Sequence, residues 1–560
     1  MRLVVLACAA ALACGRGQAP GASRGGEDGA VVGARRLPRP AFLRRVPADT
    51  PYAFAALSPM PAAYLEREYM ARVSAYQPLA EGFARLRKDK PEKFSKLTVS
   101  HRLGAALLAE LGNRRAADAL EAVGLDRSPR WILYGAGASP VIRVEVRDRE
   151  RAAAALDRVL GWLAPTERHA LGDTSYRTVN DGARRWVFAL AQGELVVAIL
   201  SVERFDAELP VALGVREPAE SLASERTLER VAGEIGAAAW SLGYVDTVRL
   251  AAQASMTMSG ACGDELGALA ALAPRVSFGV RTATERHVRM VSLVELRRDV
   301  AAALDGMRGQ MPGPEPDTQV PASLTVGLAV DVAQATTILD DAFDRINAHP
   351  FKCAALDGFN RLAKDQGSSL GWIAASPFGK VDGLTALVFA GDPPDATGTP
   401  RAPVGGVVLL GAEQPAALLQ SIAGVLPIGL PTSLNPGDAP VVVGGGVGLP
   451  LSPIHVALAK RALGFAAGGH EAELVELLAA TPLAEPPLFY VGIHVREVAS
   501  LLGGARADPP DPALAEIDQD LATRLAEIDG RAIDRFEELA IRGVPTPRGL
   551  EVSVDGHYAR

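Results

Sequence analysis

Two Gly-x-Ser-x-Gly motifs are the places where this chain could carry a nucleophilic serine. They centre on Ser23 and Ser369. In a hydrolase of this kind the serine stands on a turn from a strand into a helix, which exposes its hydroxyl at the helix N-terminus. Ser23 lies among small and polar residues that cannot form a pocket, and we expect Ser369 to follow a helix and precede a strand. A hydrolase, with an active site assembled from dispersed residues, is therefore only the alternative function.

Cofactor and metal motifs are also missing from the sequence. The glycine-rich stretches 135–140 and 444–448 lead into a strand or a hairpin, whereas a dinucleotide fingerprint must lead into a helix. The eight histidines are scattered singly, without the spacing of zinc ligands. We therefore expect no cofactor, no metal site and no catalytic residue.

The clearest chemical signal lies at Cys14, which follows an apolar run from Leu3 to Ala13. This run is too short to span a bilayer, which takes about 20 residues, and it is typical of the core of an export signal. Ala-Leu-Ala before Cys14 and Gly15 after it resemble the lipobox of bacterial lipoproteins. The resemblance implies cleavage before Cys14 and acylation of its thiol and new amino group. An ordinary signal peptide cleaved nearby is the alternative.

Composition indicates a globular protein of more than one domain. The 560 residues are too many for one hydrophobic core, and 48% hydrophobic with 22% charged residues is ordinary for folded chains. The net charge is −7, and it becomes −8 when residues 1–13, whose one charge is Arg2, are removed. Because binding to nucleic acid requires a basic face, we expect no nucleic-acid partner.

Two cysteines remain once Cys8 leaves with the signal and Cys14 carries lipid. They are Cys262 and Cys353. In an oxidising compartment of the cell envelope they could form one disulfide. Two free, buried thiols are the alternative.

After a flexible tether, residues 14–45, the chain repeats itself in order. Strand-like and helix-like segments of a first copy recur in a second copy. The paired segments are 52–57 with 324–330, 128–134 with 369–375, 141–146 with 407–410, 186–191 with 455–459, 240–244 with 490–493, and 276–280 with 539–542. The pattern predicts an α+β fold of two tandem, diverged modules, 46–311 and 321–560, joined by the linker 312–320. Short turns predict that each sheet is mainly antiparallel and packed by helices.

The opening segment Pro-Ala-Asp-Thr-Pro, Pro47 to Pro51, and the strand beginning at Trp131 are similar to those of uncharacterised bacterial envelope lipoproteins. This resemblance covers mostly the first copy. It implies the location and the fold, and it carries no catalytic residues to transfer.

The two copies differ in charge. Residues 402–459 contain two charged residues, whereas the corresponding stretch 141–187 contains sixteen. Prolines interrupt every candidate membrane span in 402–459. Either this region is buried by packing, or it forms an exposed apolar surface or cavity that meets a partner, a membrane or a lipidic ligand. In the second case Leu426, Ile428 and Leu430 would be contact residues.

These patterns together predict a non-catalytic envelope protein, anchored through N-terminal lipid, facing the periplasm or the cell surface from the outer membrane. Its expected work is binding or scaffolding of an apolar ligand or a membrane-protein partner. An inhibitor or structural partner that acts only through its surface is a third interpretation, beside the hydrolase.

Overall fold

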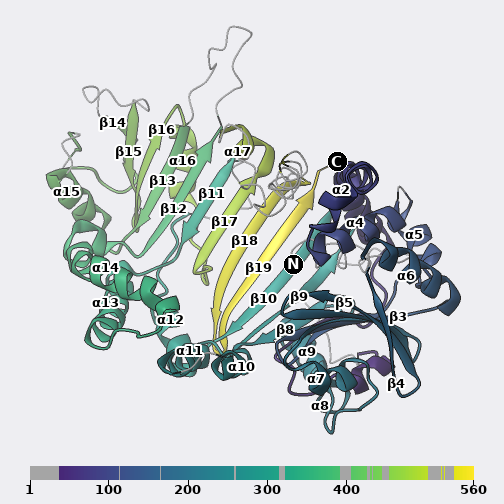
Figure 1. Ribbon diagram of the computed structural model, residues 1–560. Coiled ribbons are helices and arrows are strands. Elements are labelled where there is room, and N and C mark those ends of the chain that lie inside the picture. Colours follow the sequence, from purple (N-terminus) through teal and green to yellow (C-terminus); the bar gives the residue numbers. More distant parts are fainter. Residues whose placement is uncertain are drawn as a thin grey trace. The chain divides into compact units, whose positions relative to one another are not determined.

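The computed structural model describes most of the chain, and helices pack on antiparallel strands throughout it (Figure 1). The protein therefore belongs to the α+β class, as the sequence predicts. Within the described residues, no helix has both the length and the apolarity that a membrane crossing requires. The described ranges are 37–112, 114–163, 165–257, 260–313, 322–390, 405–425, 429–431, 433–443, 453–501 and 535–559, with Gln519 and Thr523.

The chain forms two compact units, each made of separated stretches. The first contains the described residues of 37–253, 275–292 and 519–535. The second contains those of 254–274, 293–501 and 536–559. The short segment 254–274 thus belongs to the second unit, although the chain on both sides of it belongs to the first.

The sheet of the first unit has the strand order β4-β5-β6-β7-β3-β2-β1-β8-β9, with every neighbouring pair antiparallel. Strand β10 (His287–Glu295) pairs with β9. The β6–β7 turn has positive φ at both Gln192 (55°) and Gly193 (80°), which matches the twist of a tight hairpin. The strands are β1 (Tyr52–Ala56), β2 (Trp131–Ala136), β3 (Ser139–Glu145), β4 (Glu167–Leu171), β5 (Thr174–Asp181), β6 (Arg184–Ala191), β7 (Glu194–Ser201), β8 (Leu242–Asp246) and β9 (Arg275–Ala283).

Helices cover this sheet because its strands carry apolar side chains toward them. Leu103 of α4 and Leu160 of α6 pack in one buried cluster with Phe188 of β6. Helix α4 begins where the Thr98 side chain accepts a hydrogen bond from the backbone N–H of His101, as helix caps do. The helices are α2 (Ala62–Asp89), α3 (Pro91–Ser95), α4 (Val99–Leu111), α5 (Ala116–Ala122), α6 (Arg149–Leu163), α7 (Phe205–Ala212), α8 (Leu222–Glu225) and α9 (Thr227–Ile235), after the 3-10 helix η1 (Ala41–Arg45) and before α10 (Thr247–Thr257).

A buried ion pair lies inside the first unit. Arg143 of β3 is fully buried, and its guanidinium donates to the Glu194 carboxylate and to the Ala212 carbonyl, each at 2.7 Å. Glu194 is 4% exposed and also accepts from Arg45. A Cβ at Gly214 would lie 2.9 Å from Arg143 Nη2, so this turn needs glycine. Each buried charge of the network has a partner, so removal of one would leave another charge buried without compensation.

The sheet of the second unit has the strand order β14-β15-β16-β13-β12-β11-β17-β18-β19, again antiparallel at every pair. Apart from β4, the first sheet has the same order. Strands β5, β6, β7, β3, β2, β1, β8, β9 and β10 stand where β14, β15, β16, β13, β12, β11, β17, β18 and β19 stand. The strands are β11 (Leu324–Leu328), β12 (Gly383–Phe389), β13 (Gly405–Gly411), β14 (Val441–Val443), β15 (Ile454–Leu458), β16 (Ala462–Ala467), β17 (Phe489–His494), β18 (Phe536–Thr546) and β19 (Gly549–Tyr558).

Helices lie on both faces of the second sheet. Leu418 of α15 packs with Val456 of β15 in one cluster, and Leu474 of α16 packs with Leu409 of β13 in another. Leu410 packs with the α15 cluster and its neighbour Leu409 packs with α16, and neighbours in a strand point to opposite faces of the sheet. The helices are α11 (Ala261–Leu272), α12 (Arg298–Gly306), α13 (Val332–Ala348), α14 (Asp357–Ala375), α15 (Pro415–Val425), α16 (Glu471–Ala479) and α17 (Val495–Leu501), with the 3-10 helices η2 (Ala354–Leu356) and η3 (Pro377–Lys380).

One of the paired segments predicted from the sequence is wrong. Trp131 begins β2, but Trp372 and Ser369 lie inside helix α14. Leu384 occupies the place in the second sheet that Trp131 occupies in the first. Trp131 of β2 pairs with Ala56 of β1 and Val144 of β3. Leu384 of β12 pairs in the same way with Leu328 of β11 and Leu410 of β13. The two segments were matched because each has a Ser three residues before a Trp. A pattern that covers four positions is too short to distinguish a strand from a helix.

Candidate functional site

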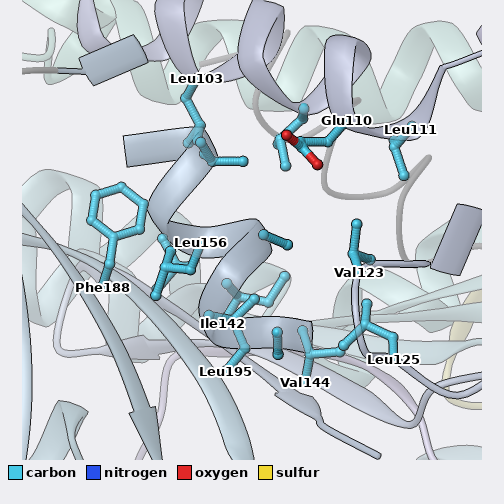
Figure 2. A pocket seen from close by; sticks show the side chains of 15 residues that line it. Leu103, Glu110, Leu111, Val123, Leu125, Ile142, Val144, Leu156, Phe188 and Leu195 are labelled. Carbon is cyan, nitrogen blue, oxygen red and sulfur yellow. The ribbon is translucent and has the colours of Figure 1, made fainter. Parts of the chain in front are cut away.

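An apolar pocket of about 110 Å³ lies in the first unit between α4, α6 and the sheet. Figure 2 shows side chains from the helices and from β3, β6 and β7 pointing into the same space. Carbon atoms form almost the whole wall. The lining residues are Leu103, Leu107, Glu110, Leu111, Val123, Leu125, Ile142, Val144, Ala152, Ala155, Leu156, Val159, Phe188, Leu195 and Val197.

The space exists because α6 faces the sheet with small residues. Ala152 and Ala155 are three positions apart, and Val159 follows four positions later, so all three lie on one side of the helix. They are buried, with 5%, 6% and 6% exposure. Opposite them, Ile142 and Val144 project from the same face of β3. The two alanines are too short to fill the gap that α4 leaves open.

The pocket has one charged lining residue, Glu110. Its carboxylate accepts from Arg158 on α6, at 2.8 Å from both Nε and Nη2. The side chain of Glu110 is 16% exposed and that of Arg158 is 53% exposed. The hydrogen bonds that Arg158 donates to Glu110 raise the pKa of the Arg158 guanidinium. The ion pair therefore neutralises the carboxylate and connects this end of the pocket to solvent.

The pocket is suited to binding apolar groups. A cavity of about 150 Å³ with similar walls can stay dry and bind benzene. Walls of leucine, isoleucine, valine and alanine supply no proton donor, acceptor or nucleophile. The pocket can therefore hold a small apolar group or the end of an acyl chain.

The predicted contact surface after α15 is only partly described. Leu426 and Ile428 lie outside the described residues. Leu430 is 7% exposed and packs in the same cluster as Ile422 and Val456. The prediction that Leu430 is an exposed contact residue is therefore wrong, because the Leu430 side chain is buried between α15 and the sheet.

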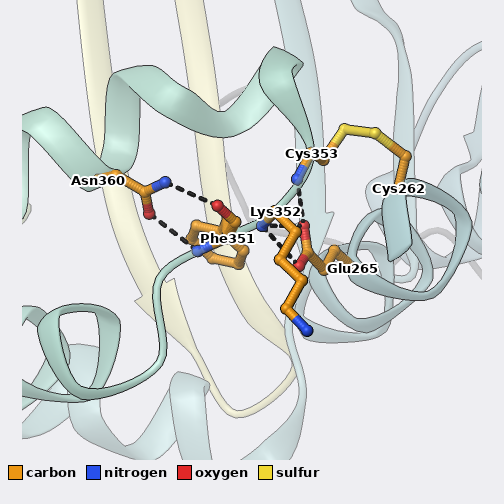
Figure 3. The surroundings of a disulfide bond; sticks show 6 residues. All are labelled: Cys262, Glu265, Phe351, Lys352, Cys353 and Asn360. Carbon is orange, nitrogen blue, oxygen red and sulfur yellow. Dashed lines mark hydrogen bonds between the residues drawn. A yellow bond between two sulfur atoms is a disulfide. The ribbon is translucent and has the colours of Figure 1, made fainter. Parts of the chain in front are cut away.

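The other predicted sites are found as follows. Cys14, the predicted tether up to residue 36 and the linker residues 314–320 lie outside the described residues. The end of the predicted tether is not flexible, because residues 41–45 form η1 and the Phe42 side chain is fully buried. Cys262 and Cys353 are joined by a disulfide within the second unit (Figure 3). Ser369 lies inside α14, where a nucleophile on a strand-to-helix turn cannot stand.

A hydroxyl, a histidine and a carboxylate meet on the β4–β5 hairpin, but their geometry does not suit catalysis. His169 Nε2 lies 3.0 Å from Thr178 Oγ1 and 3.4 Å from Glu167 Oε2. A catalytic triad uses the two different ring nitrogens of its histidine for the nucleophile and the acid. In the described part of the chain, no three Cys, His, Asp or Glu side chains gather as metal ligands would.

Comparison with protein families, with curated proteins and with solved structures gave no match. The function is therefore argued from the geometry. The sequence reasoning missed the pocket, and the signal that could have found it is the run Ala152–Ala155 in an otherwise amphipathic helix.

Proposed function

We propose that this chain is a non-catalytic, lipid-anchored protein of the bacterial cell envelope whose first unit binds an apolar ligand. The pocket between α4, α6 and the sheet is the observation that carries this proposal. The ligand class is an apolar group such as part of an acyl chain, because the walls offer dispersion contacts and almost no polar partner.

We further propose that 46–311 and 321–560 are two tandem, diverged modules. The matching strand order of the two sheets supports this. The registers of two corresponding strand pairs support it as well. The β3–β7 ladder ends where Glu145 pairs with Glu194, and the β13–β16 ladder ends where Gly411 pairs with Ala462. On this alignment Arg143 corresponds to Leu409.

The modules would then have different roles. In the first, α6 carries Ala152 and Ala155 toward the sheet and a cavity remains. In the second, Leu430 and Leu434 pack with the residues of α15 and the sheet. The lower charge of 402–459 is consistent with this packing, so the first module is the one we expect to bind the ligand.

The envelope location is supported by the lipobox resemblance at Cys14 and by the Cys262–Cys353 disulfide, because disulfides persist in oxidising compartments. We expect the Cys14→Ser variant to leave the membrane fraction, since several acyl chains anchor a protein stably. Fractionation and the intact mass of the mature protein measure this. A variant that still sediments with membranes and keeps the mass of the wild type contradicts the anchor.

The Ala155→Leu variant tests the pocket. The larger side chain should fill the cavity and weaken binding of the uncharged apolar fluorophore N-phenyl-1-naphthylamine, one ring of which would enter the pocket, about tenfold, because roughly two methylenes of contact are lost. The melting temperature should stay the same or rise, as it does when cavities are filled. Fluorescence titration and thermal unfolding measure the two effects.

Ala154→Leu on the exposed side of α6 is the matched control, and it should bind the fluorophore like wild type. Equal affinity of the Ala155→Leu and wild-type proteins would show that the fluorophore binds elsewhere and would remove the basis of the proposal.

A further inference from the structure

One face of the second sheet carries apolar side chains that remain partly exposed. Val326 of β11, Ala386 of β12, Val408 of β13 and Val491 of β17 are direct cross-strand partners, and such partners point to the same side of a sheet. Leu328 lies two residues after Val326 and so points to this side as well. Val408 is 37% and Leu328 36% exposed, and the other three are half-buried. We call this side of the four strands the open face.

The open face is apolar at every position. Within β11, β12, β13 and β17, no charged side chain and no side chain that donates or accepts a hydrogen bond lies on it. Twelve alternate positions make up this face: Leu324, Val326, Leu328, Leu384, Ala386, Val388, Gly406, Val408, Leu410, Phe489, Val491 and Ile493.

The opposite face of the same strands is the buried one, and it holds their polar residues. Thr325, Thr385 and Tyr490 are 5%, 3% and 2% exposed. The Thr385 hydroxyl donates to the carbonyl of Pro312 at 2.7 Å. An antiparallel sheet with one face in solvent ordinarily has polar side chains on that face and apolar ones in the core. The apolar composition of the open face therefore indicates that an apolar partner contacts it.

The first unit shows what covers a face of this kind when the protein covers it itself. Between β1 and β2 its chain forms α2, α4 and α5, and Leu120 of α5 packs in one cluster with Leu133 of β2, the counterpart of Ala386. Between β11 and β12 the chain forms α13 and α14, which pack on each other (Figure 1). Of the described side chains of these two helices, only Thr336 and Ala363 are buried. They therefore do not cover the open face as α2, α4 and α5 cover the first sheet.

The open face corresponds to the sheet face that lines the pocket of the first unit. On the alignment proposed above, Val408 and Leu410 correspond to Ile142 and Val144, which are lining residues of the pocket. Leu410 packs under α15, and beyond it the face continues over β12, β11 and β17. The row from β13 to β17 crosses three strand spacings, or about 14 Å. An extended apolar chain fits this row better than a compact ring does.

We propose that the open face of the second unit binds the acyl chain of a single lipid molecule. The proposal rests on the proposed function and adds, to the pocket of the first unit, an open surface for the same class of ligand. Hydrocarbon makes dispersion contacts and needs no hydrogen-bond partner, which matches a face without polar side chains. A protein partner would ordinarily bring one hydrogen bond for every 100–200 Å², and a bilayer surface is recognised through basic and aromatic neighbours. The open face offers only Phe489 for either role.

The experiment uses the full-length Cys14→Ser protein, which cannot be acylated at that position, and palmitic acid with a photoreactive diazirine in its chain. Irradiation and peptide mass spectrometry should locate the label on β11, β12, β13 and β17, and unlabelled palmitic acid should compete. The double variant Val326→Thr/Val408→Thr keeps the shape of both side chains but places two hydroxyls against the hydrocarbon. It should weaken this labelling about tenfold, with an unchanged melting temperature.

The matched control is Val544→Thr on β18. Val544 is 40% exposed, and it points away from the open face because its neighbour Gly543 pairs with Phe489. This variant should be labelled like the parent protein. Ala155→Leu should lose label only at α4 and α6, which separates this proposal from that of the pocket.

Two results would overturn the proposal. One is label that is absent from the four strands, or equally strong in the double variant, even where the pocket of the first unit is labelled. The other is a dimer, seen by light scattering without lipid, that Val326→Thr/Val408→Thr disrupts, because a second copy would then cover the open face.

Discussion

Replacing Glu194 by alanine is expected to lower the melting temperature by roughly 10 °C. Arg143 has no exposed surface and shares this carboxylate with Arg45. Without Glu194 its charge stays buried with only hydroxyl and carbonyl oxygens as partners. Breaking a buried ion pair in this way costs about 3–5 kcal/mol. Calorimetry and urea unfolding measure the loss.

The double variant Arg143→Leu/Glu194→Ala should recover most of that loss. On the alignment proposed above, Leu409 and Ala462 correspond to Arg143 and Glu194, and apolar residues often replace a buried ion pair without cost. Glu121→Ala, which breaks the exposed pair with Arg127, is the control and should change stability by about 1 kcal/mol or less. A double variant as unstable as Glu194→Ala alone would contradict the structural equivalence of the two sheets.

The Cys353→Ser variant is expected to lose about 2–5 kcal/mol of stability in the second unit. The disulfide joins residues 91 positions apart, and the stabilisation by a disulfide grows with the length of the loop it closes. It also connects segment 254–274 covalently to Cys353, which precedes η2 and α14 (Figure 3). Thermal unfolding with and without reductant measures the effect.

Wild type in reductant should melt at the temperature of Cys353→Ser, and reductant should leave the variant unchanged. Cys262→Ser should behave the same, since either change removes the same bond. Alkylation followed by mass spectrometry counts the free thiols. If reductant frees both thiols of the wild type and its melting temperature stays the same, the disulfide does not stabilise this unit.

Much of the local structure could be predicted from the sequence. The apolar runs 186–191 and 195–200, with the turn at Gln192 and Gly193 between them, correspond to β6, β7 and their hairpin. These predictions are correct because a short apolar run bounded by a turn is typical of a buried strand, and a tight turn selects glycine. Such signals lie within a few consecutive residues.

Predictions that depend on distant residues were less accurate. The sequence comparison predicts a strand at Trp372, but this residue lies in helix α14. The strand of the second sheet that pairs with β11 and β13 contains Leu384 instead, and this pairing involves residues far apart in the sequence. The charge difference between the copies left open whether 402–459 is buried by packing or forms an exposed apolar surface. At Leu430 the side chain is buried by packing. On the proposed alignment, Leu409 is the apolar counterpart of the buried Arg143.

The amino-acid sequence by itself determined the α+β class and the succession of the strands and hairpins, since periodicity and turn residues act over short distances. Only the tertiary structure decided where the pocket lies, which charges are buried together and which apolar side chains stay exposed. The physical reason is that a cavity, an ion pair or the burial of a side chain depends on what stands opposite a residue. Opposite Ala152 and Ala155 stand side chains of α4 and β3, and Glu194 stands beside Arg143 only because β7 pairs with β3.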